Sequence, residues 1–249
     1  MSRQEEIANM KKTFQTGTLQ DKLEYLWDYY KWHFIFFIVF CIFIVNMCVH
    51  LFTKKPYVLQ GCFFNTYGDY TLVNEFQEEV KNELLNNPKS EDLLIDTTIY
   101  YDSELLSEVN NFQVLQSLTA RVAAGEIDFI VAEADIMQQL AYSEYFYDLS
   151  DVLTEEQLAL YEPYFLYYDQ EILTQLDELD SDEDTSNITI PDLAKPEDMS
   201  QPVPVMIYLE NNEKLSVLYP NSQYDYAFAF VVTSKNWDKT IEFLDYMME

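Results

Sequence analysis

Hydrophobic residues dominate one run of nineteen residues near the N-terminus, at residues 34–52. The run contains no Asp, Glu, Lys or Arg. A helix of this length pairs its own backbone groups across roughly 30 Å of hydrocarbon. The pattern therefore predicts a transmembrane helix at 34–52, between a short segment at 1–33 and a large domain at 53–249.

Positive charges around this run indicate its orientation. Five Lys or Arg residues precede it, whereas Lys54 and Lys55 follow it closely. Cytoplasmic flanks carry the excess of positive residues, so we expect a cytoplasmic N-terminus and an extracytoplasmic C-terminal domain. A cleaved signal peptide is the competing interpretation. The leader exceeds thirty residues and no A-x-A-like site follows, which favours an uncleaved signal anchor in the cell membrane.

Beyond the run, apolar segments of strand length alternate with helical patterns. We predict strands at 57–65, 93–101 and 127–132, helices between them, and a further helix at 135–142. The order β-α-β-α-β-α predicts an α/β fold with a mainly parallel sheet covered on both faces. Further strands are expected at 203–209 and 215–219, as a hairpin, and at 227–233.

Two C-terminal patterns are less uniform. Residues 164–173 fit either a helix or a strand. A final helix is expected to begin near Ser234 or Asn236 and to bury one side of its surface, including Trp237 and Leu244.

Acidic residues dominate the large domain. The first 33 residues carry five basic and five acidic side chains, so the net charge of −30 belongs to the chain beyond the span. Nucleic acid is excluded as a partner, because phosphate binding needs clusters of Lys and Arg. Adhesion to anionic lipid is disfavoured for the same reason. Binding of cations, or of basic or neutral ligands, stays open.

The residue types needed for common catalytic sites are missing from this domain. The two histidines, His33 and His50, lie at or within the apolar run, which excludes Ser-His-Asp catalysis and His-ligated zinc beyond it. No P-loop, G-x-G-x-x-G or G-x-S-x-G motif occurs. We therefore expect a non-enzymatic protein with no catalytic residues and no cofactor. A glycosidase with paired carboxylates is a remote alternative, because no spacing points to a pair.

Cysteine usage is equally sparse. Cys62 is the only Cys beyond the span, so no disulfide can form within the domain. Residues 59–62 faintly resemble a bacterial lipobox, but 57–64 fits a strand better. We expect Cys62 to be a small buried hydrophobic residue in that strand.

One acidic segment has the spacing of a calcium loop at its start. Asp180, Asp182 and Asp184 match positions 1, 3 and 5 of an EF-hand. Thr185 replaces the expected Gly and Pro191 replaces the expected Glu. We therefore predict no metal site and interpret the segment as a solvated loop.

Three short segments resemble a known family. Residues 118–132, LTARVAAGEIDFIVA, resemble the helix-then-strand segment of bacterial extracytoplasmic solute-binding proteins, which serve ATP-driven importers of sugars and related solutes. Residues 147–153 and 241–246 are similar to later segments of that family. The resemblance covers about a third of the domain. It implies a type 2 periplasmic-binding fold, a small-molecule ligand and an importer permease as partner. Family members are considerably longer, which implies a reduced or missing second lobe.

The predicted topology indicates where a ligand would bind. Ligands of open α/β sheets bind beyond the carboxyl ends of strands, at the topological switch point. This selects five candidate ligand-binding residues: Asn65, Thr66, Tyr67, Glu133 and Asp135. A simple turn at 65–66 and a helix cap at 135 are the structural alternatives.

Two functions are compatible with these patterns. The first is a membrane-anchored extracytoplasmic binding module that recognises a small solute or a membrane partner. The second is a structural or interaction subunit that kept the scaffold and lost the ligand cleft.

Overall fold

Two units make up the chain, Met1–Lys54 and Lys55–Glu249. The computed structural model describes residues 15–16, 18–53, 55–101, 108–178, 188–209, 212–220 and 224–249. The segment with the calcium-loop spacing, at Asp180, Asp182 and Asp184, lies outside the described residues.

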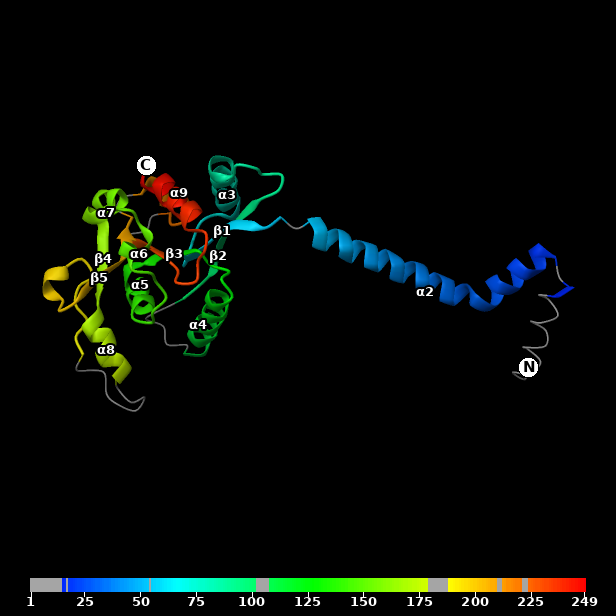
Figure 1. The fold of residues 1–249 in the computed structure, drawn as a ribbon, viewed down its shortest axis with the longest axis horizontal. Helices are drawn as coiled ribbons and strands as arrows, with labels where there is room; N and C mark the ends of the chain where they lie inside the picture. Colours follow the sequence, from blue (N-terminus) through cyan, green and yellow to red (C-terminus); the bar gives the residue numbers. More distant parts are fainter. Residues whose placement is uncertain are drawn as a thin grey trace. The chain divides into compact units, whose positions relative to one another are not determined.

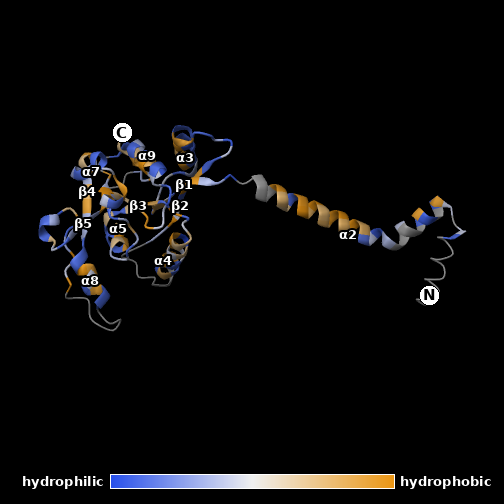
Figure 2. Ribbon diagram, viewed as in Figure 1, coloured by the Kyte–Doolittle hydropathy of each residue, from blue (hydrophilic) through white to orange (hydrophobic). Residues whose placement is uncertain are grey.

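The first unit contains one long helix, α2 (Leu19–Thr53). Its segment Tyr30–Val49 is long and apolar enough to cross a membrane, by length and composition, and a signal sequence near an N-terminus would share these properties. Figure 2 shows this apolar segment along the helix. The polar side chain of Asn46 donates to the carbonyl oxygen of Ile42 at 3.0 Å, so its amide is paired within the helix.

The second unit is built on a six-stranded sheet. In spatial order the strands are β2 (Asp92–Ile99), β1 (Tyr57–Phe64), β3 (Phe129–Glu133), β6 (Tyr226–Phe230), β5 (Pro202–Tyr208) and β4 (Phe165–Asp169). Strand β1 pairs in parallel with β2 and with β3. The other three pairings are antiparallel. The prediction of a mainly parallel sheet is therefore right for the first three strands and wrong for the sheet as a whole.

The second half of the sheet differs because β5 and β6 are neighbours joined without a crossover helix. An antiparallel pair needs no such crossover. Their connection carries a short 3-10 helix, η4 (Glu213–Val217), whose first turn is capped by the side chain of Asn212. The predicted strand at 215–219, and its hairpin with 203–209, are wrong. Leu215 and Leu218 are buried at the three-residue spacing of a 3-10 helix.

Helices cover both faces of the sheet (Figure 1). Helices α3 (Tyr70–Leu84), α6 (Leu149–Val152), α7 (Glu155–Tyr161) and α9 (Trp237–Met248) contribute to the core on one face. Helices α4 (Glu108–Ala123) and α5 (Ala134–Ala141) contribute to the other. The remaining elements are α8 (Gln170–Glu178), which follows β4, and two 3-10 turns, η1 (Glu162–Tyr164) and η3 (Pro196–Asp198).

The positions of α3 and α4 define the switch point. Strand β2 lies on one side of β1 and β3 lies on the other, so the two connections run in opposite directions. Right-handed crossovers then place α3 and α4 on opposite faces. The carboxyl ends of β1 and β3 are consequently the place where an α/β sheet of this kind binds ligands.

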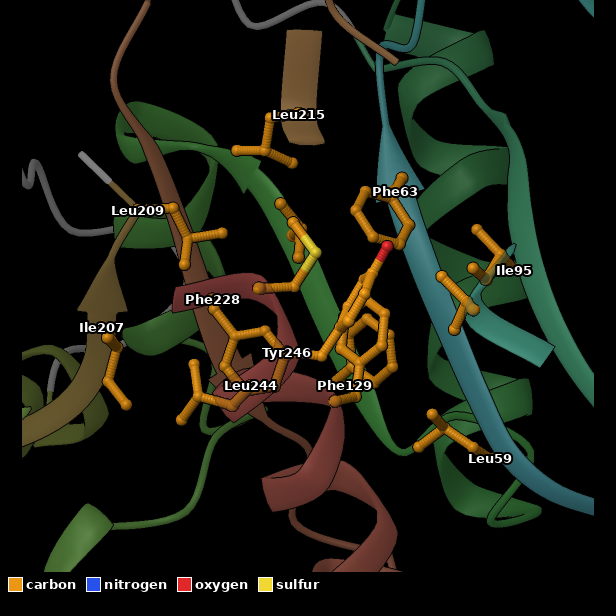
Figure 3. Packing of buried hydrophobic residues seen from close by; sticks show 14 of the residues in the cluster. Leu59, Phe63, Ile95, Phe129, Ile207, Leu209, Leu215, Phe228, Leu244 and Tyr246 are labelled. Atoms are coloured by element: carbon orange, nitrogen blue, oxygen red, sulfur yellow. The ribbon is translucent and has the colours of Figure 1, made fainter. Parts of the chain in front are cut away.

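Aromatic and aliphatic side chains fill the core on the α3 and α9 face (Figure 3). The ring of Phe129 stacks on Phe228 at 5.1 Å and on Phe243 at 4.5 Å between centroids. Gly61 provides the space for it, since a Cβ atom there would lie 2.0 Å from the Phe129 ring. Alternate residues of the same strands point to the other face, as the two-residue period of a strand requires.

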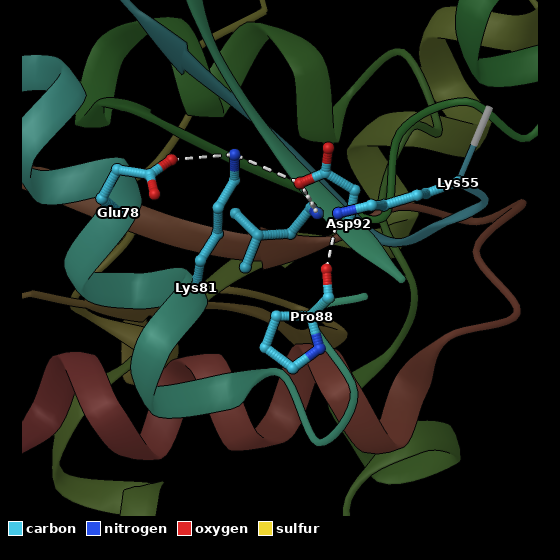
Figure 4. A network of polar contacts seen from close by, with 6 residues as sticks. Lys55, Glu78, Lys81, Pro88 and Asp92 are labelled. Carbon is cyan, nitrogen blue, oxygen red and sulfur yellow. Dashed lines mark hydrogen bonds and ion pairs between the residues drawn. The ribbon is translucent and has the colours of Figure 1, made fainter. Parts of the chain in front are cut away.

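Polar contacts tie α3 to β2, and tie Lys55, at the start of the domain, to the loop after α3 (Figure 4). Lys81 forms ion pairs with Glu78 at 3.1 Å and with Asp92 at 3.2 Å. The Lys55 ammonium donates to the carbonyl oxygen of Pro88 at 2.5 Å. The N-terminus of α3 is capped by Asp69, whose carboxylate accepts from the backbone of Thr71.

Two single-residue predictions have opposite outcomes. Cys62 is 1% exposed in β1, so the prediction of a buried cysteine is confirmed. Burial raises the pKa of its thiol to about 12, although the nearby Arg121 acts to lower it. The prediction that Trp237 is buried is wrong: it begins α9 at the surface, with its ring edge against Tyr147.

Candidate ligand-binding surface

Two of the five candidate residues serve the fold through their polar side chains. Asn65 follows β1 with a positive φ of 53° and is 6% exposed. Its amide nitrogen donates to the carbonyl oxygen of Tyr101 at 2.7 Å, and its amide oxygen accepts from the Tyr101 backbone at 2.8 Å. The Thr66 hydroxyl donates to the carbonyl oxygen of Thr97 at 3.0 Å. Both residues hold the end of β1 against the end of β2.

The connection between β5 and β6 packs against this same edge. The backbone of Tyr67 donates to the carbonyl oxygen of Leu218 at 2.9 Å. Gly68 allows this approach, because a Cβ atom at residue 68 would lie 2.5 Å from the carbonyl oxygen of Val217. The η4 segment therefore occupies part of the space beyond β1.

A pair of stacked tyrosines completes the packing of that segment. The rings of Tyr219 and Tyr226 lie 4.0 Å apart between centroids. Tyr219 is 3% exposed, and its hydroxyl donates to the carbonyl oxygen of Phe64 at 2.7 Å. Burial raises the pKa of Tyr219 well above its ordinary value, and Tyr226 and Glu133 add to the shift. The Tyr219 ring thus closes the end of β1 from the side of α3 and α9.

Tyr67 and Glu133 come together with two other tyrosines. Partial burial raises the pKa of Tyr67, and the neighbouring Tyr100, Glu133 and Tyr224 add to the shift. The three tyrosine side chains are 60%, 57% and 65% exposed at positions 67, 100 and 224. We call Tyr67, Tyr100, Glu133 and Tyr224 the tyrosine surface. It presents aromatic rings, hydroxyls and one carboxylate to solvent.

Asp135 lies in a different place. It is the second residue of α5 and lines a groove of about 630 Å³ together with Gln138, Leu166, Tyr208 and Asp225. Leu166 belongs to the core on the α4 and α5 face. Glu133 follows Phe129 and Val131 at two-residue spacing along β3, and those two residues belong to the core on the other face. The two acidic candidates, two positions apart in the sequence, therefore serve separate surfaces.

The residues that sequence reasoning missed follow or precede strands. Tyr100 follows β2, and Tyr224 and Asp225 precede β6. Tyr100 could have been predicted from the sequence, since it stands near the end of a predicted parallel strand. Tyr224 and Asp225 could not have been predicted in the same way. They reach this edge because β6 pairs antiparallel with β3, which places the amino end of β6 beside the carboxyl end of β3.

Charged side chains near the sheet are engaged with one another. Arg121 binds Asp96 at 2.6 Å beside a second pocket of about 490 Å³ between β2 and α4. Burial acts to raise the pKa of Asp96, but hydrogen bonds from Thr98 and Arg121 lower it overall. Over the described ranges, no group of three His, Cys, Asp or Glu residues is arranged to hold a metal ion.

Comparisons with known proteins give few matches. No protein-family model matches the chain, and no curated protein matches it. A solved chain similar to this one is described as the substrate-binding domain of a putative molybdenum ABC transporter from Clostridium difficile. The two share 15% sequence identity over 78% of this chain and 93% of that chain, with a TM-score of 0.31. A TM-score this low does not establish a common fold.

Proposed function

We propose that this protein is a non-enzymatic binding module, anchored by α2 in the cell membrane with its N-terminus in the cytoplasm. Its acidic domain, in this proposal, faces the extracytoplasmic side and recognises a small solute or a membrane partner through the tyrosine surface. An importer permease is the partner that the family resemblance suggests. The domain is then a reduced relative of the two-lobed solute-binding proteins.

The grouping of exposed tyrosines at the switch point is the main support for this function. Tyr67 follows β1, Tyr100 follows β2 and Glu133 ends β3, so all three lie at the carboxyl edge of the parallel strands. Tyr224 precedes β6, whose amino end pairs with the end of β3. Tyrosine offers a large apolar ring and a hydroxyl with few rotatable bonds, which suits recognition surfaces. Side chains exposed to this degree contribute little to folding and are accessible to a ligand or partner.

The second candidate, an interaction subunit without a ligand cleft, has its own support. The η4 segment packs against the loop after β1, and Asn65 and Thr66 use their polar groups within the fold. Both features reduce the space left for a solute at the switch point. On this alternative the tyrosine surface contacts a neighbouring protein directly.

A thermal-shift screen on the full chain in detergent distinguishes the two. A solute present at about 100 times its Kd adds about 2.7 kcal/mol to stability and raises the melting temperature. The double variant Tyr67→Ala, Tyr100→Ala should weaken solute binding by about tenfold or more. Tyr57→Ala, at the opposite end of β1, is the matched control and should leave binding unchanged.

Each function predicts a different response of the double variant. A solute response that the double variant loses supports the binding module. No solute response, together with cross-linking to a membrane protein that the double variant abolishes, supports the interaction subunit. If the double variant alters neither solute binding nor cross-linking, the tyrosine surface is not the recognition site.

A further inference from the structure

The groove beside Asp135 has the features of a second binding site. Its volume of about 630 Å³ is within the range of sites for small organic molecules. It lies between α5, the strands β4 and β5, and the segment that follows residue 188. It is separate from the tyrosine surface.

The walls of the groove are held in place by hydrogen bonds. The Gln138 side chain donates to the carbonyl oxygen of Pro191 at 3.2 Å, and the backbone of Tyr167 donates to that of Leu193 at 2.9 Å. These two bonds fix the outer wall to α5 and to β4. The groove is therefore formed before any ligand arrives, which limits the entropy cost of binding.

Carboxylates stand on more than one wall. Asp135 comes from α5 and Asp225 from the residue before β6, and the backbone of Ala134 donates to that of Asp225 at 2.9 Å. The Tyr208 hydroxyl donates to the Asp225 carboxylate at 2.6 Å and orients it. Asp192 is a third lining carboxylate, but its charge is offset by Lys195 at 2.9 Å. Asp135 and Asp225 thus supply the negative charge of the groove.

Apolar side chains form another part of the lining. Leu166 and Leu193 are buried in the wall, and Ile190 is 42% exposed beside them. None of the groove's described lining residues is Lys or Arg. An anion would be repelled here. An inorganic cation would need several oxygen ligands converging on one point, and among the described residues no group of three His, Cys, Asp or Glu side chains is arranged to hold one.

We propose that this groove binds an organic cation with an apolar body, of the class of linear alkyl diamines. Ammonium groups pair with Asp135 and Asp225, and the methylene chain packs against Leu166, Leu193 and Ile190. The domain's large negative charge raises the local concentration of such cations. Each methylene group buried against the wall strengthens binding by about fourfold.

The test uses the full chain in lipid nanodiscs and isothermal titration with 1,5-diaminopentane. The neutral analogue 1,5-pentanediol has the same chain length without charge and should not bind detectably. The double variant Asp135→Asn, Asp225→Asn should bind the diamine about tenfold or more weakly. Asp151→Asn is the matched control, since Asp151 is also an exposed carboxylate in a first helical turn. It should stay within about twofold of the unmodified chain.

Asp135 and Asp225 are both exposed, so their substitution should leave the fold intact, as circular dichroism would check. If the double variant does not fold, each single variant should lower the affinity by about threefold. The proposal is overturned if the diamine shows no saturable binding to the unmodified chain. Equal affinity of the double variant and the Asp151→Asn control, or equal binding of the diol and the diamine, would also overturn it.

Discussion

At the scale of single residues, buried polar groups decide how the edges of this domain are held. Asp169 ends β4 and is 3% exposed. Its carboxylate accepts from the backbone of Ser200 at 2.7 Å and from those of Gln201 and Glu171 at 3.0 Å. Burial alone would raise the pKa of Asp169, but these three donors lower it overall. One carboxylate thus joins the end of β4 to the start of α8 and to the residues that precede β5.

Replacing Asp169 with Asn should lower the free energy of unfolding by about 2 kcal/mol at neutral pH. The amide nitrogen of Asn is itself a donor, so it would face backbone N–H groups that donate to the carboxylate of Asp169. The folded-state pKa of Asp169 is depressed. Its contribution is therefore fully present above about pH 4, where the unfolded group ionises, and is lost as the pH falls through the folded pKa. Thermal unfolding at several pH values should show the two proteins converging under acid conditions. An equal difference at every pH would contradict the role of the charge.

Asn65 provides a second test at this scale, since it combines a positive φ with two buried hydrogen bonds. Asn65→Ala should destabilise the domain by about 3 kcal/mol, from the lost bonds and the left-handed backbone. Asn65→Gly should cost about 1 kcal/mol less, because Gly adopts a positive φ without penalty. Urea unfolding of both variants measures the difference. Equal losses would mean that the backbone conformation relaxes on substitution.

At the scale of elements, the sequence predicts those whose residues pack locally. The apolar stripe Val73, Phe76, Val80 and Leu84 predicts α3. The last three residues are buried, and the partly buried Val73 packs against the same core. The strands β1, β2 and β3 also follow from their apolar runs. The segment at 215–219 misleads because its buried residues pack in a 3-10 turn against residues far away in the sequence. Nothing local distinguishes that turn from a strand.

Gly68 allows η4 to pack against the loop after β1, and a substitution at this position tests that role. Gly68→Ala should displace the η4 segment, because the new Cβ atom meets the carbonyl oxygen of Val217 at 2.5 Å. We expect a loss of about 2 kcal/mol or more and faster amide exchange at Leu218. Gly125→Ala is the control. Its φ of 67° is strained, but its Cβ atom would meet nothing closer than 3.7 Å, so a loss of about 1 kcal/mol is expected with no change at Leu218.

Unaltered exchange at Leu218 in Gly68→Ala would show that η4 does not depend on that contact. A more accessible switch point in the variant, together with stronger solute binding, would favour the binding module instead.

At the scale of the whole molecule, the α/β class and the apolar helix are predictable, whereas the sheet order is only half predictable. Alternating strands and helices dictate the parallel pairing of β1, β2 and β3. The order β3-β6-β5-β4 depends on side-chain packing between segments far apart in the sequence, such as Phe129 with Phe228. The separation of the tyrosine surface from the groove beside Asp135 also depends on this strand order. Tyr224 and Asp225 reach these two surfaces only because β6 inserts beside β3.

The proposed function depends most on which side of the membrane holds the acidic domain. The apolar segment Tyr30–Val49 separates the N-terminal residues from the domain that carries the net charge of −30. The Cys62 thiol is buried, and Cys41 and Cys48 lie within the apolar segment, so a new surface cysteine can be labelled selectively in intact cells.

The decisive measurement is labelling of Asp177→Cys with a membrane-impermeant maleimide, with Gln15→Cys as the control on the other side of the apolar helix. We predict that residue 177 reacts in intact cells and that residue 15 reacts only after permeabilisation. Protection of residue 177 in intact cells, or recovery of the domain in the culture medium without α2, would contradict an anchored extracytoplasmic module.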